Sequence, residues 1–394
     1  MDKQFRLYVS HFDGYTEGCA ELDLPAGLYE IRDALEKARI SEEDYVLLTI
    51  EGCRCDELED AFEHRPQPMD TVKDIYILNA LAEKMSTMEQ HELNMAGGLI
   101  RMDKHPDRMS IERFYDLMHS TRCCHYVDVP SDYGLGKFYV ENGFLPELEN
   151  LPESVVSKLD FKRIGEEMRE AEGGVFLDDG MGYVVLHSDI IEVHKNLSPV
   201  PPEPDYTILL EIGLPDKGEP EFLKLPLSTA ELDSAPSRFG DCSWQDLSWR
   251  CADCKIPSIR DTISTADSIR QINNVAEMLD ELSGIELSTC KALLSVMKPD
   301  DLTDVVHYLA AKDEYVLSRE IASPKDVGMS RLKTALQEDE VKLLAPHVNL
   351  YAYGESAMKL YGMELTEYGG LERWDGQPVQ KQSDAPAQGG MEMC

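Results

Sequence analysis

Cysteine, histidine and aspartate side chains are the residues of this chain whose types and spacing could support chemistry. Cys251 and Cys254 form a Cys-x-x-Cys pair, with Cys242 upstream, and such a pair is typical of half a zinc site. A structural zinc ion takes four ligands, and no second ligand pair with a matching spacing follows in the sequence. We therefore expect no metal at these cysteines.

The other candidate sites lack the partners that their chemistry requires. Asp178-Asp179-Gly180 is too short for a calcium loop, and Cys123-Cys124-His125 has neither a paired acid nor basic neighbours to activate a thiol. His119 and His307 fall on predicted helices, where core and surface histidines are commoner than catalytic bases. The sequence has neither a phosphate-binding glycine loop with lysine nor a His-Glu-x-x-His motif. We expect a protein that is not an enzyme and that binds no cofactor.

The charge of the chain is its most unusual property. Its 394 residues carry 75 Asp and Glu against 38 Lys and Arg, a net charge of −37 with a pI near 4.5. The first 200 residues contribute −21 and the rest −16, so the acidity is not confined to a tail. Such a chain repels nucleic acid and anionic membranes and attracts basic surfaces. Halophilic adaptation and simple solubility are the alternative explanations.

Nothing in the sequence indicates export or membrane insertion. No apolar run approaches the ~18 residues that suggest a membrane span, and the opening MDKQFRLYVSHFDG lacks the apolar core of a signal peptide. The ten cysteines are scattered and include the adjacent pair Cys123-Cys124, as expected for reduced thiols. We expect a cytoplasmic protein without membrane contact.

The pattern of apolar residues predicts an α+β protein built from small modules. Alternation predicts strands in FRLYVSH, AELDLP and YVLLTIEG, and helical spacing predicts an amphipathic helix in GLYEIRDALEKARI. These elements form an α+β module over residues 1–70. Three helical patterns, beginning with DIYILNALAEKMSTM, form a helical module over 71–122, and a second α+β module covers 123–197.

This last module contains the stretch DYGLGKFYVENGF, which begins at Asp132. In it, FYV is apolar and β-prone, and the glycines predict a turn before it. A proline-started acidic helix follows and ends at Gly173-Gly174. VFLDDGMGYVVL then predicts a hairpin through Asp179-Gly180.

The whole plan recurs after a proline-rich linker at residues 198–204, which indicates a tandem duplication. Asn79 and Leu99 of the first copy match Asn273 and Leu293 of the second at a constant offset of 194, without a gap. The predicted parts of the second copy are an α+β module (205–265), a helical module (266–315), a C-terminal module (316–375) and a disordered tail (376–394).

These motifs resemble the ArdA antirestriction proteins of plasmids and conjugative transposons. In the N-terminal part the similarity rests on RLYVSHFDGYTEG, Leu24-Pro25, YVLLTIEG and LNALAEKM. Its more specific part is YGLGKFYVENG followed by LDFKRIGEEMREAEGGVF and GYV, which resembles the family's carboxyl-terminal antirestriction segment. Residues 4–196 match well, whereas residues 205–375 match through the internal repeat and form a degenerate second copy. Family members are usually single copies, so the duplication is a departure.

The resemblance implies an elongated protein of small modules that mimics DNA and occupies the DNA-binding groove of type I restriction–modification enzymes, on their methyltransferase and specificity subunits. DNA carries one negative charge per ~1.7 Å of axis, so 37 excess charges would cover roughly 60 Å, or on the order of 18 base pairs. A carboxylate surface can compete for a groove lined with Lys and Arg in a sequence-blind, salt-sensitive manner. We expect no direct binding to nucleic acid.

Clusters of carboxylates are the candidates for phosphate mimicry. Any single cluster could be an ordinary solvated helix face, so the interpretation rests on their sum and on the resemblance. The candidate partner-binding residues are Glu42, Glu43, Asp44, Asp56, Glu57, Glu59, Asp60, Glu147, Glu149, Glu153, Glu166, Glu167 and Glu170.

The resemblance also associates one segment with self-association and antirestriction activity. Its residues are Leu135, Gly136, Phe138, Tyr139, Val140 and Glu141. The alternative is structural, with a turn at Gly136 and core positions at Phe138 and Val140. The second copy has Ser330 and Arg331 where the aromatic pair stands, so we expect activity in the first copy.

Two alternatives concern the partners. An acidic inhibitor or scaffold could instead bind another basic DNA-binding protein, such as a CRISPR effector, a nucleoid protein or a transcription factor. The two copies could form an intramolecular pseudo-dimer, or two chains could form a homodimer.

Overall fold

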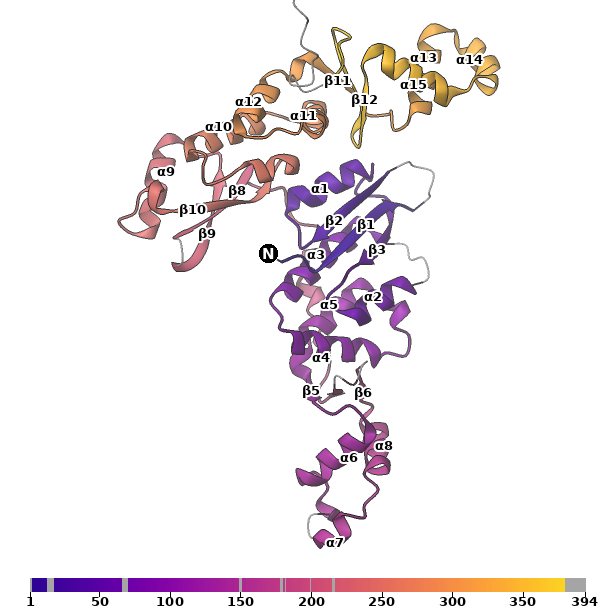
Figure 1. Ribbon diagram of the computed structural model, residues 1–394, viewed down its shortest axis with the longest axis vertical. Coiled ribbons are helices and arrows are strands. Elements are labelled where there is room, and N and C mark those ends of the chain that lie inside the picture. The colour runs from indigo at the N-terminus through magenta and orange to yellow at the C-terminus, as the bar shows by residue number, and fades with distance from the viewer. Residues whose placement is uncertain are drawn as a thin grey trace, which may run out of the picture. The chain divides into compact units, whose positions relative to one another are not determined.

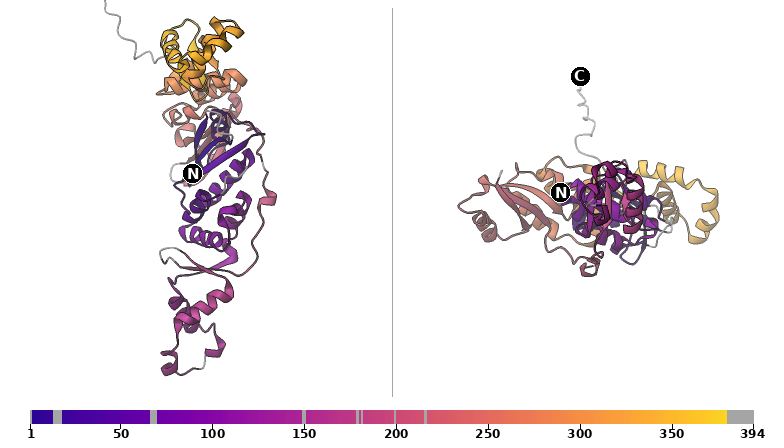
Figure 2. Two further views of the ribbon diagram at one scale, coloured as in Figure 1. Left: turned by 90° about the vertical axis from the view of Figure 1, so that its right-hand side faces the viewer. Right: turned by 90° about the horizontal axis from the view of Figure 1, so that it is seen from below.

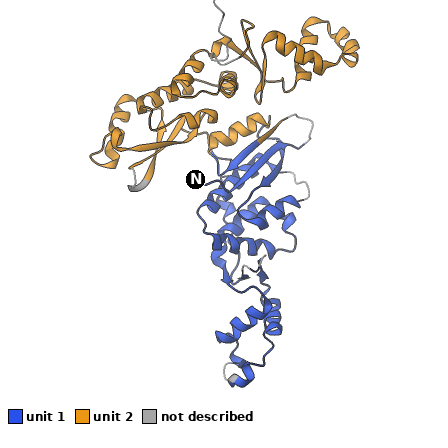
Figure 3. Cartoon of the chain, viewed as in Figure 1, with its two compact units in different colours: residues 1–12, 21–26, 41–201 blue, residues 13–20, 27–40, 202–394 orange. Residues whose placement is uncertain are grey.

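The chain divides into two compact units (Figures 1 and 3). The computed structural model describes residues 2–12, 18–65, 70–148, 151–177, 180, 182–198, 200–214 and 217–379. Unit 1 comprises residues 1–12, 21–26 and 41–201, and unit 2 comprises 13–20, 27–40 and 202–394. Small antiparallel sheets and helices alternate in both units, which confirms the expected α+β class.

Unit 1 contains most of a sheet whose strands lie in the order β2-β1-β3-β4. Side chains alternate along β1 and β3, so the opposed pairs Leu7 with Ile50 and Val9 with Leu48 are buried on one face. This alternation is the pattern that predicted the strands. The strands are β1 (Phe5–His11), β2 (Cys19–Leu24), β3 (Tyr45–Glu51) and β4 (Asp70–Thr71).

Four helices of unit 1 link this sheet to a second one (Figure 2, purple). Helix α2 packs on β3, and α4 packs on both α2 and the second sheet. The helical pattern in DIYILNALAEKMSTM puts Ile75, Leu78, Leu81, Ala82 and Met85 on one stripe of α3. All five are fully buried, so this helix prediction is confirmed. The helices are α2 (Asp56–Glu63), α3 (Val72–Ser86), α4 (Gln90–Arg101) and α5 (Ile111–His119).

The second sheet of unit 1 has the order β5-β7-β6. Val175 pairs with Val184 across β6 and β7, which confirms the predicted hairpin, although its tip at Asp178 and Asp179 lies outside the described residues. The strands are β5 (Cys124–Val127), β6 (Val175–Phe176) and β7 (Tyr183–Leu186).

Between β5 and β6 the structure corrects two predictions. The segment predicted as a turn and a β-prone run is helix α6 (Asp132–Glu141), which begins where the Ser131 hydroxyl accepts a hydrogen bond from the amide of Gly134. The predicted proline-started helix is two helices, α7 (Glu153–Val156) and α8 (Phe161–Glu172). As predicted, Gly173 ends the second one, in the left-handed conformation with a φ of 69°.

Gly136 lies in the middle of α6 because two helix backbones meet there. A methyl group on Gly136 would run into the carbonyl oxygen of Phe161, and one on Gly165 of α8 would run into the carbonyl oxygen of Asp132. The two helices therefore pack backbone against backbone, and no larger residue fits at either position. The turn interpretation of Gly136 is wrong.

Unit 2 repeats this order of elements except for α2 and β4, in whose place stands a 3-10 turn over Pro257–Thr262. Its sheets run β10-β8-β9 and β11-β13-β12, the second matching β5-β7-β6 of unit 1. Among the residues that the structure describes, no helix in either unit is long and apolar enough to cross a membrane. The elements are β8 (Ile208–Leu214), β9 (Lys217–Leu225), α9 (Thr229–Ser234), β10 (Ser248–Cys254), α10 (Ile269–Asp280), α11 (Gly284–Met297), α12 (Leu302–Ala310), β11 (Tyr315–Ser318), α13 (Pro324–Ala335), α14 (Glu338–Leu344), α15 (Leu350–Tyr361), β12 (Glu364–Thr366) and β13 (Gly369–Arg373).

Local contacts recur along with the elements. The side-chain oxygen of Asn79 accepts a hydrogen bond from Ala26 N at 2.7 Å, and that of Asn273 accepts one from Leu227 N at 2.8 Å. In α13 and α15, Gly328 and Gly354 approach the facing backbone as closely as the glycines of α6 and α8 do. The same asparagine hydrogen bond and the same close glycine contacts occur in both copies, as a duplication would produce.

Helix α1 (Leu28–Lys37) belongs to unit 2, where Asp253 of β10 caps its first turn. The Asp253 carboxylate accepts hydrogen bonds from Tyr29 N at 3.2 Å and from the Tyr206 hydroxyl at 2.8 Å. Asp253 is 2% exposed. Burial raises its pKa above the usual range, although these hydrogen bonds oppose the shift.

Replacing Gly136 with alanine tests the close approach of α6 and α8. Alanine normally stabilises a helix interior by ~0.5–1 kcal/mol relative to glycine, but a methyl group here meets backbone and should cost about 1–3 kcal/mol of unfolding free energy. Urea unfolding of Gly136→Ala measures the change, with Lys137→Ala on the exposed side of α6 as the control. A Gly136→Ala variant as stable as the control would contradict the backbone contact.

The raised pKa of Asp253 predicts that this residue makes a pH-dependent contribution to the free energy of unfolding. Because the folded-state pKa lies above the ordinary value of 3.8, this contribution is fully favourable below that pH and is lost as the pH rises through the folded pKa. Urea unfolding from about pH 3.5 to 7 should show the wild type losing stability relative to Asp253→Asn over this window. Asp261→Asn, at a side chain 94% exposed, is the control and should run parallel to the wild type.

Candidate functional site

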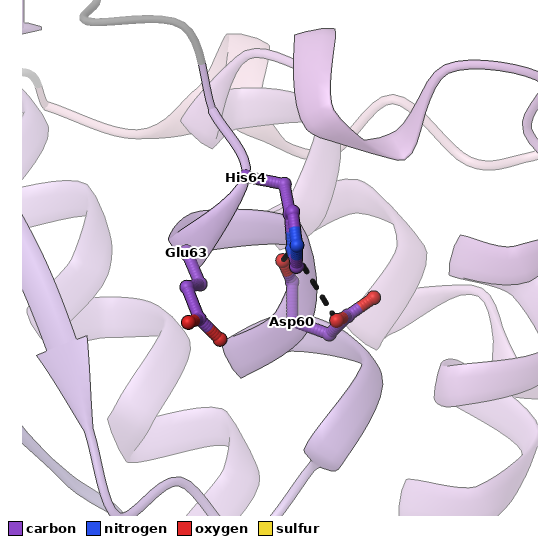
Figure 4. A group of neighbouring side chains, drawn as sticks. All are labelled: Asp60, Glu63 and His64. Atoms are coloured by element: carbon purple, nitrogen blue, oxygen red, sulfur yellow. Dashed lines mark hydrogen bonds and ion pairs between the residues drawn. The ribbon is translucent and has the colours of Figure 1, made fainter.

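One group of possible metal ligands comes together in the described part of the chain, at the end of α2 (Figure 4). Asp60, Glu63 and His64 place ligand atoms within 4.8 Å of one another, and all three side chains are exposed. The Nδ1 atom of His64 lies 2.9 Å from the carbonyl oxygen of Asp60, and this contact is the main cause that raises the pKa of His64. The histidine nitrogen thus caps the helix, and nothing buried holds the group in place for an ion.

The cysteine pair of β10 lies in a bulge. The register slips between Cys251 and Asp253, so Cys251 and Cys254 oppose Leu210 and Ile208 on the same core-facing side of the sheet. Contact with the second thiol and burial raise the pKa of Cys251 far above its usual range. Metal ligands and nucleophiles are thiolates, so this environment favours neither.

The other thiols and histidines singled out in the sequence have similarly unreactive settings. Burial raises the pKa of Cys124 to about 11. His119 stacks on Tyr115 with ring centroids 4.5 Å apart, and burial lowers its pKa. His307 contacts Tyr308 instead, with centroids 5.5 Å apart, so the two histidines do not share one environment.

The predicted carboxylates of α2 divide into structural and solvent-facing groups. Glu57 is 15% exposed and pairs with Arg101 at 3.3 Å, and Glu59 accepts hydrogen bonds from Gly52 N at 3.0 Å and Cys53 N at 2.8 Å. Asp56 and Asp60 are exposed. With Glu63 they lie along one side of a helix that contains no basic residue, and we call these three residues the α2 carboxylate face.

The predicted acidic turn before β3 divides in the same way. Glu42 and Glu43 are exposed. Asp44 accepts hydrogen bonds from Ser41 N at 2.7 Å and from the Ser41 hydroxyl at 2.8 Å, which lower its pKa. Asp44 therefore stabilises the turn, and its two neighbours face solvent.

The carboxylates of the α6–α8 hairpin, residues 132–173, are partly neutralised by their neighbours. On α8, Glu166 lies 3.5 Å from Lys162 and Glu167 lies 2.9 Å from Arg163, whereas Glu170 is exposed. Such i,i+4 pairs reduce the negative potential of this helix. Of the remaining predicted residues, Glu147 is exposed, Glu149 lies outside the described residues, and the side chain of Glu153 is not described.

The segment predicted for self-association lies on α6 and faces two ways. Leu135 and Gly136 are buried, and Leu135 packs with Tyr183 of β7. Phe138 and Val140 are only half-buried, so the prediction that they are core residues is wrong. The exposed Glu141 lies 3.5 Å from Lys137, and Tyr139 is half-buried.

Tyr139 ties α6 to the end of α8. Its hydroxyl donates to the two carboxylate oxygens of Glu172 at 2.7 and 2.8 Å, and burial together with this carboxylate raises the pKa of Tyr139. In the second copy Arg331 and Tyr361 replace this pair, and the guanidinium lies over the ring, 4.3 Å from its centroid. A cation–π contact has thus replaced a hydrogen bond between the same two helices.

The two hairpins differ in charge. Residues 132–173 contain ten acids and five bases, whereas residues 324–362 contain five of each. The neutral hairpin of unit 2 also exposes large apolar side chains. These are Leu343, Leu344, Tyr351, Tyr353, Leu360 and Tyr361.

Sequence reasoning missed two structural roles. It did not predict that Glu172 accepts the Tyr139 hydrogen bond, although the paired replacement by Tyr361 and Arg331 in the second copy is a detectable signal. It also did not separate carboxylates that cap turns or pair with bases from those facing solvent. That distinction depends on contacts far apart in the sequence, such as Glu57 with Arg101.

Comparison of the sequence with models of known protein families found no match, and a search of curated proteins found none either. The similarity to the ArdA family therefore rests on the sequence motifs alone.

Replacing Tyr139 with phenylalanine tests the contact between α6 and α8. The change removes a charge-assisted hydrogen bond at a half-buried position and should lower the unfolding free energy by about 1 kcal/mol. Tyr133→Phe, at a side chain 56% exposed, is the control and should change stability by less than about 0.5 kcal/mol. Equal stability of the two variants in urea unfolding would show that the Tyr139 hydroxyl contributes nothing.

Proposed function

We propose that this protein is a non-enzymatic, cytoplasmic DNA mimic that inhibits a type I restriction–modification enzyme by occupying its DNA-binding groove. The observation that carries the proposal is the net charge of −37, together with carboxylates that face solvent on several elements of unit 1. The resemblance of residues 4–196 to the ArdA family supplies the class of target.

The spacing of the exposed carboxylates supports mimicry only when several elements act together. Residues four apart on a helix are ~6 Å apart along its axis, so Asp56, Asp60 and Glu63 carry about one charge per 5 Å. One DNA strand carries one charge per ~3.4 Å. The α2 carboxylate face is therefore sparser than a DNA strand, and the turn at Glu42 and Glu43 must add to it.

The charge distribution supports activity in the first copy. The α6–α8 hairpin is net acidic, whereas the equivalent hairpin of the second copy has no net charge. Both hairpins expose large apolar side chains, such as Phe144 in the first and Leu360 in the second, so charge is what distinguishes them. A groove lined with Lys and Arg gains affinity by exchanging counterions for negative charge, and a neutral apolar surface offers no such gain. We therefore assign the inhibitory surface to the first copy.

Charge removal on α2 tests the proposal. In a DNA cleavage assay with a type I enzyme, the wild type should inhibit, and Asp56→Asn/Asp60→Asn/Glu63→Gln should inhibit about tenfold less well because three charges leave the contact surface. Raising the salt concentration should narrow this difference, since exposed charges are screened.

The matched control removes three exposed carboxylates from the second copy. Glu338→Gln/Asp339→Asn/Glu340→Gln changes the net charge by the same amount on α14, where Glu338 pairs with Lys342 and Glu340 accepts a hydrogen bond from Gln337 N. This variant should inhibit like the wild type. Equal losses in both triple variants would mean that net charge alone matters. No inhibition by the wild type at low salt would refute the proposal.

A further inference from the structure

Within unit 2, basic side chains form ion pairs with the acidic side chains of helix α1. Its Glu30 pairs with Arg260, and its Asp33 and Glu36 both pair with Lys291 of α11. All three carboxylates of this helix are thus turned toward basic side chains inside unit 2 and are mostly shielded from solvent.

Lys291 lies at the centre of these contacts. Its Nζ atom is 2.8 Å from Asp33 Oδ1 and 2.8 Å from Glu36 Oε2, and its side chain is only 5% exposed. The Tyr368 hydroxyl lies 3.0 Å from both oxygens of Asp33, and the Ser288 hydroxyl donates to Glu36. The ammonium pairs with two carboxylates, and each carboxylate also accepts a hydroxyl hydrogen bond, so the charged groups that burial would otherwise penalise have partners.

Further contacts hold the two ends of the helix. At the first turn, Asp253 accepts a hydrogen bond from Tyr29 N at 3.2 Å. Beyond the last turn, Arg39 donates to the carbonyl oxygen of Ile321 at 3.0 Å. Recognition therefore extends along the whole helix, with charge at the centre and backbone contacts at both ends.

The first copy has no equivalent of the Lys291 site, and the second copy has no equivalent of the acids that bind to it. At the constant offset of 194, Lys291 corresponds to Gly97 of the first copy. The helix that corresponds to α1 is α9, and aligning the N-caps Gly27 and Ser228 places Ser234 and Ser237 where α1 has its two Lys291-bound acids. The lysine occurs in the second copy alone, and the pair of acids that contacts it occurs in the first copy alone, although α9 carries two other acids, Glu231 and Asp233.

We propose that the second copy carries a recognition site for an acidic helix, centred on Lys291 with Arg260, Ser288 and Tyr368, and that α1 is its resident ligand. The two copies have diverged into a receptor and its ligand, which gives the second copy a role in binding the first. Unit 2 thereby withdraws three carboxylates of the first copy from solvent. This inference does not rest on the proposed DNA mimicry.

Hydrogen exchange of the full chain tests the site. Lys291→Met keeps most of the aliphatic stem but removes the buried ammonium from Asp33 and Glu36. These carboxylates keep only their ion pairs with the more exposed Lys37 and Arg319. Amides of α1 should therefore exchange at least about tenfold faster than in the wild type. Helix α12 of the same unit is the internal reference and should change by less than about threefold. The triple variant Lys291→Met/Asp33→Asn/Glu36→Gln removes all three charges and should return α1 to within about threefold of the wild type.

A milder variant keeps the test decisive if Lys291→Met does not fold. Arg260→Gln removes the ion pair with Glu30, whose two side chains are 28% and 17% exposed, and should speed exchange in the first half of α1 by about threefold. Unchanged exchange of α1 in the variants that fold would overturn the proposal. Equal acceleration of α1 and α12 would also overturn it, because Lys291 would then support unit 2 generally and not α1 in particular.

Discussion

Repulsion among negative charges is the constraint on which the rest of this structure depends. An excess of 37 negative charges opposes any compact state, and the few bases available must be placed where they offset it most. The described residues show three uses of carboxylates that lower this cost. Some cap turns and helix ends, as Asp44 and Glu59 do, and others pair with bases on the same helix. The third use is burial against Lys291.

The carboxylates that face solvent are therefore mainly those that neither cap a turn or helix nor pair with a buried base. Asp56 and Glu63 have no base on their own helix, Asp60 lies 3.4 Å from the exposed His64 that follows it, and Glu42 and Glu43 stand in an exposed turn. Carboxylates without an internal structural role are available for a basic partner, and their attraction to it acts at long range and decreases with salt. This division of labour, more than the net charge alone, connects the fold with the proposed function.

Much of the fold could be predicted from the sequence, because in most elements the apolar residues recur at the spacing of a strand or a helix and are the residues that become buried. The strand around Leu7 and the stripe of α3 that includes Leu78 follow directly from their spacing. Prediction fails at α6, where β-prone aromatic residues lie in a helix because Gly136 allows α8 to approach its backbone. The membership of α1 in unit 2 depends on pairs such as Asp33 with Lys291, which are far apart in sequence and follow no local pattern.

The central claim is that solvent-facing carboxylates compete with DNA for a basic groove. Its most direct test is displacement of a labelled DNA duplex from a type I methyltransferase, followed by fluorescence anisotropy over a series of salt concentrations. The account predicts complete displacement at low salt, with the logarithm of the apparent affinity falling linearly with the logarithm of the salt concentration. No displacement at low salt, or displacement that is independent of salt, would contradict it.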